Sequence, residues 1–363
     1  MSEKRYLTAG VVGAGMMGRR YIGNIRERFP QIRVKRVCAA HLESARRLAE
    51  GTDILPCAYE DILADDEIDL VLCLTPACTH EEIIRRALEA GKHVYTEKTM
   101  TIAPETAKAL ALLADEKGLL LGSAPDTFLG ASLQTARRAI DEGLIGEPTS
   151  FTAAANRDNE RMLSFYSFLR MPGGGVCYDY GVYYMTAIVS LLGPVAETAA
   201  FVRAPWPTHI NIDPASPLYG QEMDTPNESE VSAILRLRSG VTGTFHLNAD
   251  SVRGDRAHFA VYGTKGILYL GDPNQFGCPV RLLRSDASEP EELPMPFGYR
   301  VESRGLGAAD LARAVLEGGR PRADKAIAVH VEEVLSAILS SGEDHAFHTI
   351  SSTCERPEPM PEL

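Results

Sequence analysis

The sequence predicts an α/β protein with two domains that contain different kinds of sheet. At 363 residues the chain is longer than a single hydrophobic core usually grows. Up to about Ala124, short apolar runs alternate with longer amphipathic stretches, which is the order of βαβ units around a doubly wound parallel sheet. Further along, strand-like runs follow one another across short glycine turns, which indicates an α+β domain with an open, largely antiparallel or mixed sheet. We therefore place the domains at 1–124 and 125–350, followed by a polar tail at 351–363.

The first domain is expected to contain five parallel strands, each of them a short apolar run. The strands are Leu7–Val12, Val34–Ala39, Leu70–Leu74, His93–Thr96 and Leu119–Gly122. Helical patterns lie between them at Glu43–Glu50, Glu81–Ala90 and Pro104–Lys117. The last of these has proline in its first turn, where helices tolerate it because the N–H would lack a helical partner anyway.

The second domain is expected to begin with a long apolar helix at Tyr180–Leu192. Strands follow at Ser232–Leu237, Val241–Leu247, His258–Tyr262 and Gly266–Leu270. The segment Ala204–Asn227 contains five prolines and is expected to form a long loop. Two helical patterns, Ala308–Leu316 and Ala326–Leu339, close the domain.

Composition excludes several kinds of partner. The formal net charge is −12 and the basic residues are scattered, so the basic surface of a nucleic-acid binder is missing. The seven cysteines form no CxxC pair, which argues against a structural metal or a disulfide framework. There is neither an apolar signal segment nor a run of about 18 apolar residues. We expect a cytoplasmic protein with a small-molecule partner and with no metal, nucleic acid or membrane partner.

Three glycines at GxGxxG spacing follow the first strand and open a helix: Gly13, Gly15 and Gly18. In this setting, Gly13 permits the tight turn, Gly15 lets the backbone approach a pyrophosphate, and Gly18 allows close packing of the helix on the strand. The helix N-terminus, which carries Met16 and Met17, then faces the phosphates. We therefore expect a Rossmann domain that binds a dinucleotide, NAD or NADP.

The second strand ends without the acidic residue that usually holds the ribose 2′-hydroxyl of NAD. Ala39 and His41 stand in this region, and Arg46 and Arg47 follow. His41 with either arginine could contact the 2′-phosphate of NADP, or all three could simply lie on an exposed loop and helix surface. The sequence leaves the choice between NAD and NADP open.

Three further motifs carry a resemblance to a known family. TPACTH at 75–80 follows the third strand, GKHVYTEK at 91–98 ends the fourth, and GGGVCYDYGVY at 173–183 opens the long apolar helix. Together they resemble the TPxxxH, EKP and GGG…DxGxH signatures of the Gfo/Idh/MocA oxidoreductases, a resemblance that spans nearly the whole chain. It implies an enzyme that uses a nicotinamide cofactor on a carbohydrate-like substrate.

The resemblance also implies roles for individual residues. By it, Thr75, Pro76 and His80 line the cofactor. Glu97 lies near the nicotinamide and Lys98 reaches the substrate oxygen. The position of Lys98 supports this independently, because the carboxyl end of a parallel strand faces the crevice where α/β sheets bind ligands. A lysine ammonium there can polarise a carbonyl or stabilise a developing alkoxide.

Two positions depart from the family pattern. Thr99 replaces the proline after Glu-Lys, so a rigid residue is missing beside Lys98. Tyr183 replaces the histidine that serves the family as general acid or base. A phenol, whose pKa is normally about 10, is a poor base unless a nearby cation stabilises the phenolate. We expect Tyr183 to carry the proton with Lys98 as its electrostatic partner.

Asp179 lies four residues before Tyr183, so the two side chains share a face if the segment is helical. We expect Asp179 to orient the substrate or to tune Tyr183. Further polar residues are candidates for surrounding a hydroxyl-rich substrate. They are Asp126, Asn156, Arg157, Tyr166 and Arg304.

The leading functional hypothesis is reversible hydride transfer between a nicotinamide and a secondary hydroxyl or ketone of a sugar, polyol or glycoside. One alternative is redox-neutral glycoside cleavage or epimerisation through a transient keto-sugar. Another is a non-catalytic, ligand-sensing regulatory protein on the same fold. The resemblance also implies a homodimer, a homotetramer or a larger homo-oligomer.

Overall fold

The chain folds into two compact units in a computed structural model that describes residues 5–252 and 258–362. The first unit contains the residues up to Asp126 and also Ser303–Val329; the remainder forms the second. This division differs from the predicted one, which assigned all of 125–350 to one domain. Ser303–Val329 belongs to the first unit because it supplies a helix that packs on the parallel sheet. Residues 1–4 and Leu363, predicted as parts of the first domain and the tail, lie outside the described residues.

The first unit is built on six parallel strands in the order β3-β2-β1-β4-β5-β6. Their bounds are β1 (Leu7–Val12), β2 (Ile32–Cys38), β3 (Leu55–Pro56), β4 (Leu70–Cys73), β5 (His93–Thr96) and β6 (Leu121–Ser123). Every residue of β4 is buried, as expected for a parallel strand covered by helices on both faces. The five predicted strands are confirmed with small shifts at their ends. The short strand β3 was not predicted, since its two residues are exposed and follow no apolar run.

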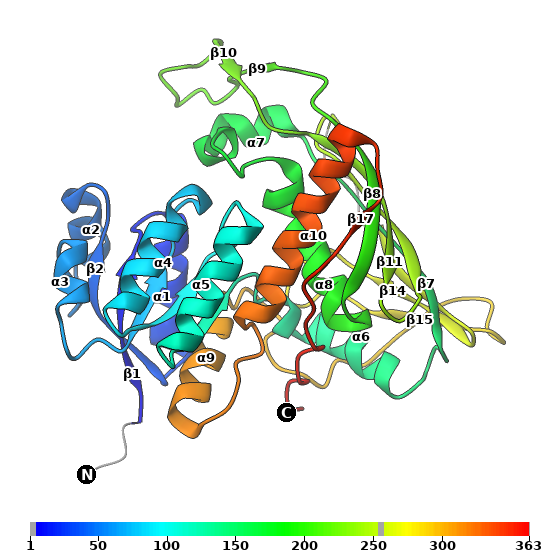
Figure 1. The fold of residues 1–363 in the computed structure, drawn as a ribbon, viewed down its shortest axis with the longest axis horizontal. Helices are drawn as coiled ribbons and strands as arrows, with labels where there is room; N and C mark the ends of the chain where they lie inside the picture. Colours follow the sequence, from blue (N-terminus) through cyan, green and yellow to red (C-terminus); the bar gives the residue numbers. More distant parts are fainter. Residues whose placement is uncertain (1–4, 253–257, 363) are drawn as a thin grey trace. The chain divides into compact units, whose positions relative to one another are not determined.

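Helices cover both faces of this sheet, which appears in blue and cyan in Figure 1. Their bounds are α1 (Met16–Arg28), α2 (Leu42–Ala49), α3 (Tyr59–Leu63), α4 (His80–Glu89), α5 (Pro104–Glu116) and α9 (Leu306–Glu317). Val94 of β5 packs with residues of α3, α4 and α5 in one apolar cluster. Its neighbour Tyr95 faces the opposite side because side chains alternate along a strand. There it meets Tyr21 of α1 and Gly307 of α9.

The second unit contains a nine-stranded sheet in the order β16-β15-β14-β13-β7-β12-β11-β8-β17. The bounds are β7 (Pro148–Asn156), β8 (Val195–Arg203), β11 (Glu230–Leu237), β12 (Thr242–Asn248), β13 (His258–Gly263), β14 (Gly266–Leu270), β15 (Arg281–Arg284), β16 (Glu291–Glu292) and β17 (His348–Thr349). Only the β7–β12 pair is parallel, so the prediction of a mixed, largely antiparallel sheet is confirmed. The central strand β7 and the strand β8 were not predicted, because alanine and threonine give them no strong apolar alternation.

One face of this sheet is covered by helices and the other is exposed, as the alternating burial of β11 shows. The covering helices are α6 (Ala131–Asp141), α8 (Val182–Leu192) and α10 (Lys325–Asp344), and α10 begins in the first unit. The helix α7 (Asn159–Phe165) instead packs against the turn at Ser167–Arg170 and the strand β9 (Thr208–Ile210). In Figure 1, α6 and α8 lie on the same side of the strands. The predicted helix at Tyr180–Leu192 is confirmed, and it begins as a π-helical turn at Cys177–Gly181.

Two predicted irregular segments have more order than expected. The proline-rich segment Ala204–Asn227 contains a short hairpin, β9 (Thr208–Ile210) with β10 (Glu222–Asp224), so it is not entirely a loop. The described part of the tail forms no helix or strand, yet it packs along α6. There the Arg137 guanidinium donates to the Pro357 carbonyl at 2.8 Å. Within the described residues, no helix combines the length and apolar composition needed to cross a membrane.

Candidate active site

The glycine loop after β1 leaves open space at the start of α1. Gly13 has a φ of +118°, and a Cβ there would clash with the Leu74 carbonyl. A Cβ on Gly18 would clash with the Gly13 carbonyl. At Gly15, by contrast, no described atom beyond its chain neighbours and own helix lies within 4 Å of the Cβ position. Packing therefore requires Gly13 and Gly18, whereas Gly15 keeps space free beside the backbone.

The N-terminus of α1 suits an anion. Gly15 is the N-cap and has no side chain, and the first turn carries no acidic residue. The first N–H groups of a helix lack helical acceptors and lie at the positive end of the helix dipole. Met16 is largely exposed and Met17 is half-buried. The loop fits the pyrophosphate of a dinucleotide.

The end of β2 offers neutral and basic groups. Ala39 is half-buried, and His41 is exposed as the N-cap of α2. The nearest acidic residue in the chain is Glu43, whose carboxylate lies 3.7 Å from the Arg46 guanidinium. Both side chains of this pair are exposed, so it contributes little stability.

The loop after β4 holds Thr75 half-buried and Pro76 exposed. His80, predicted to line the cofactor, is instead fully buried. Its Nδ1 lies 2.7 Å from the Thr99 carbonyl oxygen, and its Nε2 lies 2.8 Å from the Thr75 carbonyl oxygen. Burial lowers the pKa of His80, although both carbonyl contacts oppose this shift. Its ring thus joins the loops after β4 and β5, and its role in lining the cofactor stays a prediction.

The loop after β5 carries Lys98 between two buried residues, Glu97 and Thr99. The Tyr21 hydroxyl donates to Oε1 of Glu97 at 2.8 Å, and the Lys98 N–H donates to Oε2 at 3.1 Å. Because β1, β4 and β5 are neighbours in the sheet, this loop and the glycine loop lie at the same carboxyl edge. Two strand spacings separate them, which is about 10 Å.

Two residues predicted to bind substrate are buried in the first unit. Asp126 is 1% exposed, and its Oδ2 accepts from the N–H groups of Gly305 and Gly307 at 2.9 and 3.0 Å. Burial raises the pKa of Asp126 to about 6, while the Gly307 N–H and the Arg304 guanidinium oppose the shift. Arg304 is 9% exposed. The Asp126 carboxylate thus binds the start of α9 with Arg304 near it, and a role for either residue in substrate binding stays a prediction.

In the second unit, Asp179 belongs to a side-chain network. A guanidinium nitrogen of Arg157 lies 2.7 Å from Oδ2 of Asp179, and both side chains are nearly buried. The same guanidinium lies over the Tyr180 ring at 4.7 Å, and the Tyr180 hydroxyl donates to Asp272 at 2.9 Å. Tyr183 lies in the first turn of α8, with its ring edge-on to Tyr180 at 6.2 Å. Asp179 and Tyr183 thus both lie in helical turns, which is the condition under which the two side chains were expected to share a face.

The other two predicted substrate residues lie elsewhere in the second unit. Asn156 is the last residue of β7, where it pairs with Asn248 of β12. Tyr166 ends α7 and packs against an apolar cluster that contains Leu163 and Leu169. Of the five predicted substrate residues, Arg157 contacts a predicted catalytic residue, Asp179.

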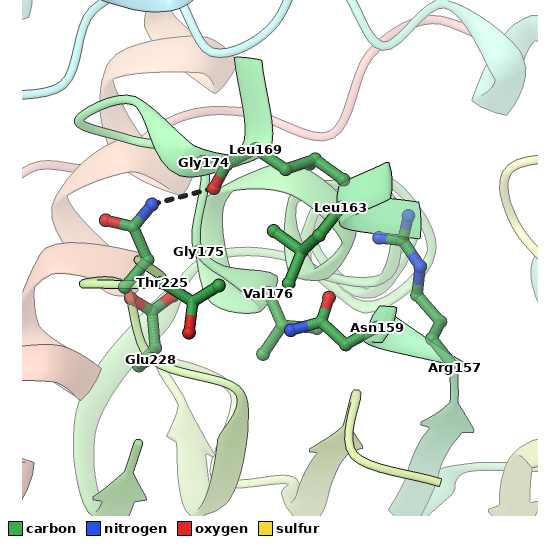
Figure 2. Close-up of a pocket in the computed structure, with 10 residues that line it drawn as sticks. Arg157, Asn159, Leu163, Leu169, Gly174, Gly175, Val176, Thr225 and Glu228 are labelled. Atoms are coloured by element: carbon green, nitrogen blue, oxygen red, sulfur yellow. Dashed lines mark hydrogen bonds between the residues drawn. The ribbon is translucent and has the colours of Figure 1, made fainter. Parts of the chain in front are cut away.

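The triple-glycine motif lines a small pocket in the second unit, which Figure 2 shows with Arg157 and Glu228 on opposite sides. A Cβ on Gly175 would clash with the Glu228 carboxylate, and one on Gly174 would clash with the Leu169 carbonyl. Oε1 of Glu228 accepts from the Cys177 N–H at 2.9 Å, at the start of the π-helical turn. Burial raises the pKa of Glu228. These glycines therefore allow close packing that fixes the turn carrying Asp179.

Sequence reasoning missed Tyr21, Glu228 and Asp272. Each contacts a residue of a recognised motif, but from 76, 51 and 92 positions away. No local signal marks such partners. Within the described residues, no three histidine, cysteine or acidic side chains gather in a way that could hold a metal ion.

Two models of one protein family match this chain. The first is described as an oxidoreductase family with an NAD-binding Rossmann fold and matches residues 7–124. The second is the GFO/IDH/MocA C-terminal domain and matches residues 133–269. The matches fall on the two sheets described above.

Individual proteins of known identity are also similar. The chain is 28% identical to a dTDP-3,4-didehydro-2,6-dideoxy-alpha-D-glucose 3-reductase of Actinomadura kijaniata, over 94% of this chain and 97% of that protein. A solved 3-ketoreductase from Actinomadura kijaniata, in complex with NADP, is 25% identical with a TM-score of 0.72, covering 93% and 97% of the two chains. Levoglucosan dehydrogenase in complex with NADH and levoglucosan has a TM-score of 0.81 at 21% identity, covering 96% and 100%. At that identity the last likeness shows the fold alone.

Proposed function

The chain belongs to the Gfo/Idh/MocA family of oxidoreductases and uses NAD or NADP, and from this premise we propose that it acts on a carbohydrate-like substrate. The proposed reaction is reversible hydride transfer between the nicotinamide and a secondary hydroxyl or ketone carbon of a sugar, polyol or glycoside. The observation that carries the proposal is in the first unit. A glycine loop with free space at Gly15 and a lysine, Lys98, occupy the same carboxyl edge of the sheet.

The bound dinucleotide would supply or take up the hydride at C4 of its nicotinamide. The Lys98 ammonium would polarise a substrate carbonyl. In the reducing direction the carbonyl oxygen would take a proton from the Tyr183 hydroxyl. In the oxidising direction the substrate hydroxyl would give its proton to the Tyr183 oxygen, with Lys98 as the electrostatic partner of Tyr183. Asp179, held by Arg157, is suited to accept a hydrogen bond from a substrate hydroxyl rather than to transfer the proton.

The substrate class is supported by the relatives. The 28% identical protein is named as a reductase of a dTDP-linked keto-sugar. The solved 3-ketoreductase binds NADP. We therefore place sugars and their glycosides first among the candidate substrates of this chain.

A second copy of the chain is the proposed partner of the open sheet face. Phe201 of β8 is 71% exposed and Ile234 of β11 is 51% exposed, on strands that pair within this face. Large apolar side chains exposed together often mark an interface. We expect Phe201→Glu combined with Ile234→Lys to lower the molar mass measured by light scattering. An unchanged mass would rule this face out.

The function is tested with a panel of sugars, polyols and glycosides, each incubated with NAD and with NADP and followed by the absorbance of reduced nicotinamide. Net accumulation or consumption of the reduced cofactor supports the dehydrogenase. Product formed without a net change supports the redox-neutral alternative instead. Substrate binding, measured by calorimetry, with no product under any condition would support the ligand-sensing alternative.

Two variants then test the residue roles. Lys98→Ala and Tyr183→Phe should each lower kcat by about 10²–10⁴-fold, the usual contribution of a positioned proton donor or acceptor. Tyr184→Phe is the matched control, because Tyr184 is the next residue on α8 and is fully buried. If Tyr183→Phe retained the kcat of the control, Tyr183 would not be the proton carrier.

A further inference from the structure

Lys98 is flanked on both sides by residues that are fixed from neighbouring helices. Glu97 and Thr99 are 7% and 4% exposed. Tyr21 of α1 binds the Glu97 carboxylate. His80 of α4 contacts the Thr99 carbonyl oxygen. A lysine between two immobilised residues has a fixed main chain, so less conformational entropy remains to be lost when its side chain meets a substrate.

The Tyr21 contact is a buried, charge-assisted hydrogen bond. Its hydroxyl donates to one carboxylate oxygen of Glu97, and the other oxygen accepts from the Lys98 N–H. Burial raises the pKa of Tyr21, and Glu97 adds to that shift, so the phenol remains a donor at neutral pH. The carboxylate thereby links α1 to the peptide nitrogen of Lys98. Hydrogen bonds to an ionised acceptor are about twice as strong as neutral ones.

The His80 contact holds the other side of the lysine. Its ring bridges the carbonyl oxygens of Thr75 and Thr99, which can only accept. The neutral ring can donate to one of them, and the imidazolium can donate to both. The Thr99 hydroxyl also donates to the Thr101 carbonyl at 2.6 Å. These bonds supply the rigidity that a proline would otherwise give at position 99.

Both helices begin at loops that face the proposed dinucleotide site. The α1 helix follows the glycine loop, and α4 follows Thr75 and Pro76. We propose that Tyr21 and His80 are positioning residues that fix Lys98 relative to the dinucleotide-binding loops. This inference rests on the proposed function for its effect on turnover, but its effect on Lys98 itself is independent of that function.

The first test measures turnover in the full-length protein with the best substrate of the panel. Tyr21→Phe and His80→Gln should each lower kcat by about 10–100-fold, because a small displacement of a reacting group has effects of this size. The dissociation constant for the dinucleotide, measured by fluorescence titration, should change far less. If both variants bound the dinucleotide more weakly but kept the kcat of the wild type, the inference would be overturned.

The chain offers a matched control for each variant. Tyr95 lies beside Tyr21, with ring centroids 6.5 Å apart, and its buried hydroxyl has no hydrogen-bond partner among the described residues. His93 accepts a hydrogen bond from the Leu120 N–H at the far end of β5. Tyr95→Phe and His93→Gln should leave kcat unchanged. Equal losses in variants and controls would mean that Tyr21 and His80 serve the fold only.

The second test needs no activity. Lysines are reductively methylated with ¹³C-formaldehyde, and the Lys98 methyl signal is assigned by its absence in Lys98→Arg. Its chemical shift and its titration midpoint should move in Tyr21→Phe and His80→Gln but not in the controls. If the Lys98 methyl signal did not move in either variant, the inference would be wrong, even if the enzyme is active. A moved signal in a protein without turnover would leave the inference standing and overturn the proposed function.

Discussion

The two units build their parts of the candidate site from different groups. The first unit uses the main chain: an open glycine loop, the N-terminus of α1 and a lysine whose neighbours are held by hydrogen bonds. The second unit uses side chains: Arg157 pairs with Asp179 and stacks on Tyr180, which donates to Asp272. A site made of main-chain groups depends on the spacing of residues within a local sequence motif. A network of side chains depends on contacts between residues that are far apart in the sequence. The difference predicts that a substitution at Gly15 will impair dinucleotide binding in the first unit and that removing one charge of the Arg157–Asp179 pair will destabilise the second.

The largest effect is expected at the glycine loop. Gly15→Ala should raise the dissociation constant for the dinucleotide by about 100-fold, or about 2.7 kcal/mol, because its methyl group occupies space that a phosphate needs. Its melting temperature should match that of the wild type, since no described neighbour would meet the new methyl group. Calorimetric titration and a thermal melt measure the two quantities.

Gly18→Ala is the matched comparison, because its Cβ would clash with the Gly13 carbonyl. This variant should lower the melting temperature of the protein as well as its affinity for the dinucleotide. If Gly15→Ala bound the dinucleotide as tightly as the wild type, the phosphates would have to lie elsewhere.

The next effect concerns the ion pair of the second unit. Asp179→Asn should destabilise this unit by about 2 kcal/mol, because it leaves a nearly buried guanidinium without its carboxylate. Arg157→Gln should cost a similar amount, and the double variant less than the sum, with a coupling of about 1–2 kcal/mol. Thermal melts of the four proteins measure the cycle. Strict additivity would show that the pair is not coupled.

A smaller effect is expected for cofactor choice in the first unit. Ala39→Asp should shift the ratio of kcat/KM values toward NAD by about tenfold, because a carboxylate there holds the ribose 2′-hydroxyl and repels a 2′-phosphate. Ala39→Asn, which carries no charge, should shift the ratio less. Equal ratios in all three proteins would place the adenosine ribose away from the end of β2.

The smallest effect is a pH dependence from Asp126, whose pKa is raised to about 6 by burial. Between its unfolded pKa and this value the folded state binds more protons, so acidification stabilises the fold and rising pH removes that gain. From pH 7 to pH 5.5 the wild type should gain about 1 kcal/mol relative to Asp126→Asn. The amide can still accept from Gly305 and Gly307, so the variant isolates the charge. Parallel stability curves would show that Asp126 has an ordinary pKa.

The same comparison explains which parts of the site could be predicted. The strand ends at Val12 and Thr96 follow from local apolar runs, and so the glycine loop and Lys98 could be placed at the carboxyl edge of the sheet. The contact of Asp126 with the start of α9, by contrast, could not be predicted. A polar residue after a strand has the same local sequence whether it faces a ligand or caps a helix 179 positions away.

The sequence by itself determined the alternation of strands and helices in the first unit, the dinucleotide loop and the place of Lys98 after a strand, because each depends on residues close together in the chain. Only the tertiary structure decided that His80 joins two loops, that Tyr21 binds Glu97 and that Arg157 pairs with Asp179. These contacts form between segments that folding brings together, and their hydrogen bonds depend on atomic positions that neither composition nor spacing encodes locally.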